Sequence, residues 1–428
     1  MLTDPGRDAG HLAAQPAVAT APGVIPLLRR GAWHVSADRE PPARPGLPAV
    51  SLAPQILIRT DARHLRGRPG PRLTDRAGRA RVLAAAWQRF TSGQVHLAGA
   101  GPQGYAAFSE LLWRAAGLPA VLVDRWCRLL GDQLAALFAG AGPGEHATGA
   151  GTPLGLVALP GNTFTCLYSV FEAALAGMAV WIRPSSREPF SALRLVCAML
   201  EEGWPAELAG YYPSGRDVLP TMVEVTDRQV IYGGRDVAAA VGGTPTAQVH
   251  GPLRVCAVVP AGADPDLAAE RLRDLAAADA GRFCTALRAI LCLGDPAPVA
   301  AGLAARLDAI PLAPPDPRLP MAASPDRGRA AATAAFIQAH LAGAGQLTRR
   351  PLLAEAGGAT YLAPALVGLP AAPAGEASWD GGHPLFGLEV PFPFATIMAV
   401  SADQAARLSG HADVTHQVEA DEHDGSPQ

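Results

Sequence analysis

The sequence predicts an α/β protein built from two Rossmann-like units. From about residue 152 onward, short apolar segments alternate with segments of helical periodicity, and several of the turns between them are rich in glycine. This alternation is typical of a parallel sheet with crossover helices, and glycine-rich turns suit such a sheet to nucleotide binding. The chain has 428 residues, of which 49 % are hydrophobic, so it is long enough for two domains with sizeable cores.

The charge composition argues against nucleic acid or an anionic membrane as a partner. The formal net charge is -3 and is spread along the chain, and every strongly basic residue is an arginine. Binding to a polyanion would need a basic patch. No uncharged apolar run reaches about 18 residues, and the N-terminus lacks the pattern of a secretion signal. We therefore expect a soluble, cytoplasmic protein.

The six cysteines are scattered and form no CxxC pair. This spacing predicts free thiols in a reducing compartment, with neither a disulfide framework nor a metal site. Cys256 and Cys292 lie inside predicted strands, where packing is the expected role. Cys284 lies instead where a predicted helix ends and a strand begins, so it can be held rigidly and still be reached by a substrate.

The N-terminal part shows little regular patterning. Residues 1–50 are rich in proline, alanine and glycine, so we expect a poorly ordered tail with one short strand near 31–36. A helix is predicted over 79–90, and a pair of helices, broken near 117–119, over 105–138. A glycine-rich link then leads into the alternating region.

The alternating region divides into two units. Gly177 is a typical helix stop in the first of them. In this unit we expect strands at 155–161, 178–184 and 229–234, and helices at 163–177, 187–203 and 235–242. In the second we expect strands at 253–260, 286–294 and 359–369, and helices at 264–281 and 328–343. The predicted domains are a nucleotide-binding domain over 51–250, a catalytic domain over 251–398 and a short C-terminal tail over 399–428.

Five segments between about residues 150 and 398 resemble the aldehyde dehydrogenase superfamily in order and interval. They are LPGNTFT, AVWIRPSSREPFSALRL, QVIYGG, GRFCTALRAIL and HPLFGLEVPF. The resemblance implies an aldehyde dehydrogenase-like fold, with the active site at the interface of two Rossmann-like domains. Within the superfamily, the segments IYGGRDVAAAV, QVHGPLRVCAVV and YYPSGRD are similar to the acyl-CoA reductase branch, the luciferase-linked fatty acid reductases.

The resemblance makes Cys284 the catalytic nucleophile, since its segment matches the family's cysteine loop. A thiolate attacks a carbonyl carbon well, and a nearby positive charge or dipole favours its formation. Asn162, together with the backbone N–H of Cys284, would hold the oxyanion, and such a donor contributes about 3–4 kcal/mol. Alternatively, Asn162 only caps the helix that begins at Thr163.

The resemblance also implies a nicotinamide cofactor. Arg183 can contact a 2′-phosphate, which favours NADPH over NADH, although NADH stays open. Ser185 or Ser186 contacts the adenosine ribose or, alternatively, caps the next helix. The residues matched to cofactor binding are Pro160, Arg183, Ser185, Ser186, Gly233, Gly234 and Phe386.

Two departures from the family pattern bear on the direction of the reaction. Oxidising members carry a glutamate that activates water, whereas this stretch contains no carboxylate and has His250 at about that place. His250 is either a general acid or base, or a turn histidine bonded to backbone. The glutamate that holds the nicotinamide ribose in the family is replaced near Pro384, while Phe386 and Gly387 remain.

Three functions therefore remain open. The first is reduction of an activated acid, an acyl thioester or acyl adenylate, to an aldehyde. The second is aldehyde oxidation, and the third is a catalytically degenerate partner of an acid-activating enzyme. Relatives continue beyond the equivalent of this C-terminus into a strand that pairs with a partner subunit. We expect that strand to be absent, which leaves the form of any homo-oligomer open.

Overall fold

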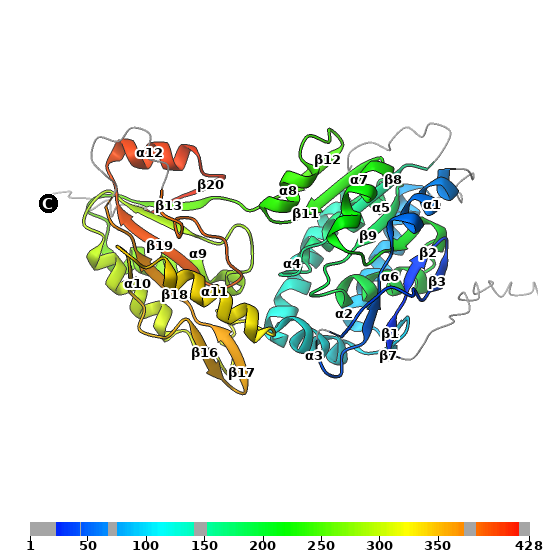
Figure 1. Ribbon diagram of the computed structural model, residues 1–428, viewed down its shortest axis with the longest axis horizontal. Helices are drawn as coiled ribbons and strands as arrows, with labels where there is room; N and C mark the ends of the chain where they lie inside the picture. Colours follow the sequence, from blue (N-terminus) through cyan, green and yellow to red (C-terminus); the bar gives the residue numbers. More distant parts are fainter. Residues whose placement is uncertain (1–22, 43, 67–74, 141–151, 372–381, 419–428) are drawn as a thin grey trace, which may run out of the picture.

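The computed structural model describes residues 23–42, 44–66, 75–140, 152–371 and 382–418, in two α/β units that lie side by side (Figure 1). The N-terminal unit surrounds a seven-stranded sheet and the C-terminal unit a six-stranded sheet. The first sheet ends in chain order with β12 (Ala247–His250), and the second begins with β13 (Val255–Val259). The chain therefore passes from one unit to the other over residues 251–254.

The first sheet has the order β12-β11-β8-β9-β10-β2-β3, and its strands from β12 to β10 are parallel. Every residue of β8 is buried, as expected for a parallel strand with helices on both faces. These strands are β8 (Leu154–Ala158), β9 (Ala179–Arg183), β10 (Ala209–Tyr211) and β11 (Arg228–Tyr232). The helices of this unit are α1 (Gln55–Arg66), α2 (Arg76–Ser92), α3 (Tyr105–Ala116), α4 (Ala120–Ala139), α5 (Tyr168–Leu175), α6 (Phe190–Glu201), α7 (Leu219–Val225) and α8 (Arg235–Val241).

The expectation of a poorly ordered tail over residues 1–50 is wrong for the part that the structure describes. Residues 23–51 form five short strands, and two of them extend the first sheet by antiparallel pairing. Ile25, Leu27 and Leu28 are fully or almost fully buried. The strand predicted near 31–36 is confirmed by β3, whereas the other four strands were missed because strands of two or three residues have no detectable period. The strands are β1 (Val24–Ile25), β2 (Leu27–Arg29), β3 (Ala32–His34), β4 (Arg39–Glu40) and β5 (Ala49–Ser51), and residues 1–22 lie outside the described part.

The second sheet has the order β15-β18-β19-β14-β13-β20 and is parallel except at β15. Along β14, Ile290 and Cys292 face one hydrophobic cluster while Ala289 and Leu291 face another, so the sheet is buried on both sides. Its strands, besides β13, are β14 (Ala289–Cys292), β15 (Gly345–Gln346), β18 (Ala365–Gly368), β19 (Phe394–Ala399) and β20 (Val414–Gln417). The helices are α9 (Pro265–Ala277), α10 (Ala297–Ala309), α11 (Arg327–Ala339) and α12 (Ala402–Gly410), and β16 (Leu353–Ala356) and β17 (Ala359–Leu362) form a separate hairpin.

The C-terminal tail expected over 399–428 is likewise wrong for its described residues. Ser401 and Gln404 form a capping box that begins α12, and β20 then pairs in parallel with β13. The capping box is a sequence-level signal of a helix start, so α12 was predictable from these two residues. Residues 419–428 lie outside the described part.

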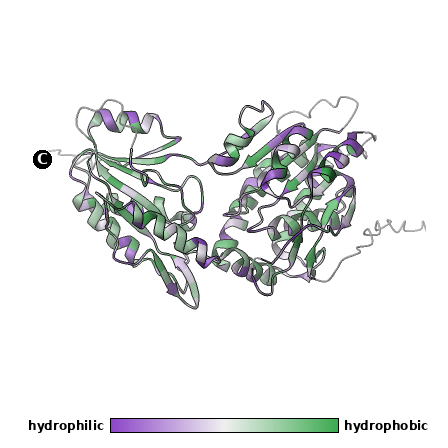
Figure 2. Cartoon of the chain, viewed as in Figure 1, coloured by the Kyte–Doolittle hydropathy of each residue, from purple (hydrophilic) through white to green (hydrophobic). Residues whose placement is uncertain are grey.

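Hydrophobic residues occur throughout both units (Figure 2), and the buried ones form three hydrophobic clusters. All six cysteines are free thiols, and Cys256 and Cys292 are buried on β13 and β14, which confirms their packing role. Among the described residues, no single helix is long and apolar enough to cross a membrane, although α3 and α4 together pass the same test as a pair bent by 111°.

Candidate active site

Cys284 lies in a loop that begins with a left-handed turn. α9 ends at Ala277, earlier than predicted, and the next residues Asp279, Ala280 and Gly281 have φ angles of 51°, 57° and 63°. A Cβ on Gly281 would lie 2.5 Å from the backbone of Phe392 and of Pro393. Only glycine allows this close approach, which places the cysteine loop directly against the segment before β19.

Two buried arginines hold the loop in place. Arg288 donates to Gly281 O at 2.7 Å and to Phe392 O at 3.0 Å, so it fixes the contact that Gly281 allows. Arg282 donates to Ala116 O at 3.0 Å and to Ala323 O at 3.1 Å, which ties the loop to the end of α3 in the first unit. Burial lowers the pKa of each guanidinium to about 10, so both remain charged at neutral pH.

The side chain of Asn162 also joins the two units. Its amide nitrogen donates to Arg282 O at 2.5 Å, two residues before Cys284. The following turn is capped instead by Thr163, whose hydroxyl accepts from Thr165 N at 3.1 Å, so the helix-cap alternative for Asn162 is wrong. A primary amide has two N–H donors, and this bond uses one of them. The oxyanion role of Asn162 remains a prediction.

The Cys284 thiol is half-buried, and its pKa is raised. Burial is the largest cause, and the carboxylate of Glu389 is the second. The backbone N–H groups of Cys284 and Thr285 and the charge of Arg288 act in the opposite direction and favour the thiolate. The thiol is therefore mostly protonated at neutral pH, and its attack on a carbonyl needs a group that takes the proton.

Glu389 is a functional candidate that the sequence pattern did not identify. Its charge acts on both Cys284 and Arg288, and it follows the Phe386–Gly387 pair by two residues. The signal was present, because Glu389 lies inside the HPLFGLEVPF segment. It was missed because the family pattern puts a water-activating carboxylate upstream of the cysteine.

His250 lies at the end of β12, where its ring stacks on Tyr232 with centroids 4.5 Å apart and planes 11° apart. Burial lowers the pKa of His250, so the imidazole is neutral at neutral pH. Among the described residues, no hydrogen bond, ring contact or charge interaction joins His250 to Cys284. Its backbone carbonyl accepts from Gly233 N at 3.1 Å, while a role as general acid or base stays a prediction.

A second thiol, Cys166, lies near Cys284 and was not predicted. Burial and the charge of Cys284 raise the pKa of Cys166 to about 12, and the hydroxyl of Tyr232 hydrogen-bonds to it. The same hydroxyl lies 2.8 Å from the hydroxyl oxygen of Ser169. Tyr232 therefore links the end of β11 to the turn before α5, on the first-unit side of Cys284.

A cavity of about 840 Å³ lies between the two units, and its size is typical of a small-molecule site. The predicted cofactor residue Gly234 lines it from the N-terminal unit. The predicted cofactor residue Phe386 and the carboxylate residue Glu389 line it from the C-terminal unit. A Cβ on Gly234 or on Gly251 would have no neighbour within 4 Å, so the backbone is open to a ligand at both glycines. This geometry fits a nicotinamide cofactor, because its pyrophosphate needs close approach to backbone.

Other predicted cofactor residues are engaged within the first unit. The Arg183 guanidinium donates to Ser214 Oγ at 3.1 Å and to Ser214 O at 3.0 Å. Ser185 Oγ accepts from Arg187 N at 3.3 Å, and Ser186 is exposed. The remaining predicted residues are Pro160, which is partly exposed after β8, and Gly233, where a Cβ would lie 2.6 Å from Val237.

The helix after these serines is capped by neither of them. Both Phe190 N and Ser191 N donate to one carboxylate oxygen of the buried Glu188 at 2.8 Å. The alternative that Ser185 or Ser186 caps α6 is therefore wrong. Their role in cofactor binding, like that of Arg183 toward a 2′-phosphate, remains a prediction.

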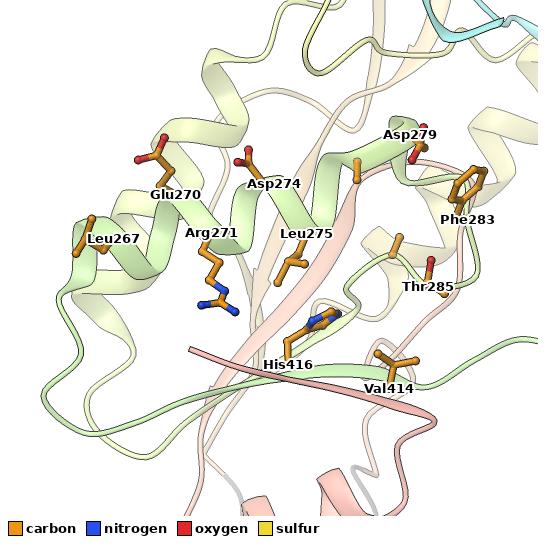
Figure 3. A pocket seen from close by; sticks show the side chains of 12 residues that line it. Leu267, Glu270, Arg271, Asp274, Leu275, Asp279, Phe283, Thr285, Val414 and His416 are labelled. Carbon is orange, nitrogen blue, oxygen red and sulfur yellow. The ribbon is translucent and has the colours of Figure 1, made fainter. Parts of the chain in front are cut away.

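A second cavity, of about 760 Å³, lies between α9 and β20 beside the cysteine loop (Figure 3). Phe283 and Thr285, the two neighbours of Cys284, both line it. The ring of Phe283 stacks on Trp126 of α4, and Trp126 Nε1 donates to Asp279 Oδ1 at 2.8 Å. The cysteine loop therefore forms part of the wall of this cavity.

Comparison with solved structures shows the same fold in several aldehyde dehydrogenases. The NAD-dependent benzaldehyde dehydrogenase of Corynebacterium glutamicum matches with a TM-score of 0.73 and 15% identity over 93% of this chain and 90% of that one. An NAD-dependent aldehyde dehydrogenase of Sinorhizobium meliloti matches with a TM-score of 0.70 and 17% identity over 92% and 80%. Betaine aldehyde dehydrogenase of Staphylococcus aureus, solved in complex with NAD+, matches with a TM-score of 0.68 and 14% identity over 92% and 87%.

These matches confirm the predicted fold class, with its two α/β units and the cysteine loop at their interface. No curated protein sequence matches the chain. The family model described as Aldehyde dehydrogenase family matches residues 144–368, which is more than half of the chain and includes both Asn162 and Cys284. The chain therefore belongs to the aldehyde dehydrogenase family.

Proposed function

We propose that the protein reduces an activated carboxylic acid to an aldehyde, through a thioester on Cys284. The main observation in support of this proposal is the identity of the residues at the end of β12. Val249 and Gly251 line the cavity between the units, while the His250 ring is stacked on Tyr232. The described residues 247–251 at this strand end include no carboxylate that could activate water, so an acyl group on Cys284 should be poorly hydrolysed.

The described residues fit the acylation step. The Cys284 sulfur attacks the carbonyl carbon of the donor, a carbon–sulfur bond forms, and the bond to the leaving group breaks. The thiol proton passes to a base, for which we propose the Glu389 carboxylate because its charge acts on the thiol, and then to the departing group. Asn162 and the Cys284 backbone N–H would hold the oxyanion of the tetrahedral intermediate.

The second step uses the cavity that Gly234 and Phe386 line. A reduced nicotinamide bound there would supply the hydride that turns the thioester into a thiohemiacetal. The thiohemiacetal then collapses, which releases the aldehyde and returns the electron pair of the carbon–sulfur bond to the Cys284 sulfur. The chemistry suits NADPH or NADH, and NADPH is the proposed cofactor because Arg183, the last residue of β9, can contact a 2′-phosphate.

Aldehyde oxidation is the second candidate, and the position of Glu389 favours it. A carboxylate that acts on the Cys284 thiol can also activate water if water reaches both groups. In that case the thioester formed from an aldehyde would be hydrolysed to the free acid.

One measurement separates these candidates. Acid and aldehyde released from the same acyl thioester are quantified with and without reduced cofactor. The proposed function predicts that aldehyde forms faster with cofactor than acid forms without it. Acid released as fast as aldehyde would support oxidation, and release of neither, together with no cofactor binding, would support a catalytically degenerate partner of an acid-activating enzyme.

A further inference from the structure

Tyr232 and His250 form an aromatic pair at the carboxyl ends of two neighbouring strands, β11 and β12. The strands are parallel and Tyr232 is paired in register with His250, so the two side chains lie on the same face of the sheet. Their rings stack with centroids 4.5 Å apart and planes 11° apart. Both residues are only partly buried, so water can reach the pair.

The order of the strands places Tyr232 between His250 and the cysteine loop. The sheet runs β12-β11-β8, and Asn162 lies in the turn after β8 (Figure 1). The Asn162 side chain donates to Arg282 O, two residues before Cys284. Neighbouring strands of a sheet are about 4.8 Å apart, so about 10 Å separates β12 from the strand whose end meets the cysteine loop.

The hydroxyl group of Tyr232 holds the ring in this intermediate position. It lies 2.8 Å from the hydroxyl oxygen of Ser169, near the start of α5. Burial raises the pKa of Tyr232 to about 12, so the phenol stays protonated at neutral pH and can donate this hydrogen bond. The Tyr232 side chain is therefore held both by the stacked imidazole and by α5.

His250 can act as a base, so its distance from Cys284 matters for the reaction. Burial lowers the pKa of His250, although the carboxylate of Glu172 on α5 acts in the opposite direction, so the imidazole is neutral at neutral pH. A neutral imidazole accepts a proton from water. In the part of the chain that the structure describes, no hydrogen bond or ion pair engages this ring.

We infer that Tyr232 is a positioning residue that keeps the His250 imidazole away from the acyl group on Cys284. The inference rests on the proposed function and adds a reason why the thioester waits for hydride. In hydrolysis, a water oxygen bonds to the thioester carbon and its proton passes to the imidazole. The carbon–sulfur bond then breaks, and the sulfur takes the electron pair and the proton. With the Tyr232 ring between His250 and the cysteine loop, this reaction lacks its base.

The test follows the acyl-enzyme in the absence of cofactor. Cys284 is acylated by a thioester, excess donor is removed, and mass spectrometry of the intact protein records the loss of the acyl group. In Tyr232→Ala, which removes the ring, this loss should be at least about tenfold faster than in wild type, because a general base becomes available. Tyr232→Phe keeps a stacked ring and should stay close to wild type.

The double variant Tyr232→Ala/His250→Gln shows whether the imidazole is responsible. It should lose the gain in hydrolysis that Tyr232→Ala produces. The rate of acylation is the internal control, since a variant that only loosened the active site would also acylate more slowly. An acyl-enzyme of unchanged lifetime in Tyr232→Ala, or a gain that persists in the double variant, would overturn the inference.

Labelling with diethyl pyrocarbonate tests the stack without any acylation step. Peptide mass spectrometry should find faster modification of His250 in Tyr232→Ala than in wild type or Tyr232→Phe, and equal modification in all three would contradict the inference. The proposed function can fail separately. If Tyr232→Ala shortens a long-lived acyl-enzyme but wild type forms no aldehyde with reduced cofactor, the proposed function is wrong and the role of Tyr232 stands.

Discussion

At the scale of single residues, the reactivity of Cys284 depends on the charge of Glu389. Burial and this carboxylate both raise the pKa of the Cys284 thiol, so the thiolate fraction is small at neutral pH and grows as pH rises toward that pKa. Reaction with an alkylating agent should therefore increase with pH. The same carboxylate that disfavours the resting thiolate is the proposed acceptor of the proton during attack.

Substitution of Glu389 by glutamine should separate these two effects. Removal of the negative charge lowers the pKa of Cys284, so the pH profile of iodoacetamide labelling should move to lower pH. Acylation by a thioester should nevertheless slow by about tenfold or more, because general-base catalysis is lost. Glu110→Gln, at an exposed position of α3, is the control and should leave both measurements unchanged. A labelling profile that does not move would show that Glu389 does not act on the thiol.

Two cysteine variants, one at Cys284 and one at the buried Cys292, test the assignment of the nucleophile. Cys284→Ala should abolish aldehyde formation, since no thioester can form. Cys292→Ala removes a buried sulfur from β14 and should leave turnover within severalfold, at a stability cost of about 1 kcal/mol. Mass spectrometry after incubation with acyl donor alone should find the adduct on the peptide that contains Cys284. An acyl group on another cysteine would remove Cys284 from the mechanism.

The sequence allowed Cys284 and Asn162 to be named as candidates, because each lies within a quoted segment of fixed order. Glu389 and Tyr232 also lie within quoted segments, but the family pattern gives neither of them a role, and Cys166 directly follows such a segment. Their proximity to Cys284 depends on how the two units meet, and no local pattern records that arrangement. For His250, the sequence predicted its place in the family pattern but could not predict that its ring stacks on Tyr232.

At the scale of elements, the cysteine loop is shaped by the turn after α9. Gly281→Ala should destabilise the protein by about 2 kcal/mol or more, because the added Cβ would clash with the backbone at 392–393 in addition to the cost of a left-handed φ. Gly262→Ala is the matched control, since φ there is +88° and a Cβ meets nothing within 4 Å. It carries the backbone cost alone, about 1 kcal/mol.

Urea denaturation measures both glycine variants, and aldehyde formation reports the loop. We expect Gly281→Ala to lose activity at urea-free conditions while Gly262→Ala keeps it. If both glycine variants lost the same free energy of unfolding, the close approach of Gly281 to Phe392 and Pro393 would not contribute to the cost of the Gly281→Ala substitution.

The predicted element boundaries agree best with the structure where the predicted segments are long. The predicted helix over 79–90 lies inside α2, while the strand predicted over 359–369 is split into β17 and β18 around Ala363 and Pro364. α10 was missed because it is rich in alanine. Its buried residues Val299, Leu303 and Leu307 recur every four positions and would have indicated a helix.

At the scale of the whole molecule, Arg282 joins the two units. Arg282→Ala should lower the free energy of unfolding by about 3 kcal/mol, since it leaves buried carbonyls without donors. Arg59→Ala removes an arginine from an exposed ion pair with Glu224 and should cost less than about 1 kcal/mol. Chemical denaturation of the two variants makes the comparison, and similar small losses would show that Arg282 does not couple the units.

This junction marks the limit of what the sequence could predict. Arg282 and its acceptor Ala116 are 166 residues apart, and only Arg282 lies in one of the family segments. The order of the family segments predicted two units with an active site between them. It could not predict which carbonyls would meet the buried guanidinium, because that depends on the packing of α3 against the cysteine loop.

The two cavities have a consequence for the order of ligand binding. They have no lining residue in common, so an occupant of one does not exclude an occupant of the other. If the nicotinamide binds between the units and the acyl donor approaches from the cavity that Phe283 and Thr285 line, an unreactive analogue of the acyl donor should inhibit non-competitively toward NADPH and competitively toward the acyl donor. Initial-rate inhibition patterns test this directly. Competition between the analogue and NADPH would instead place both ligands in one cavity, with a single entrance that each must vacate for the other.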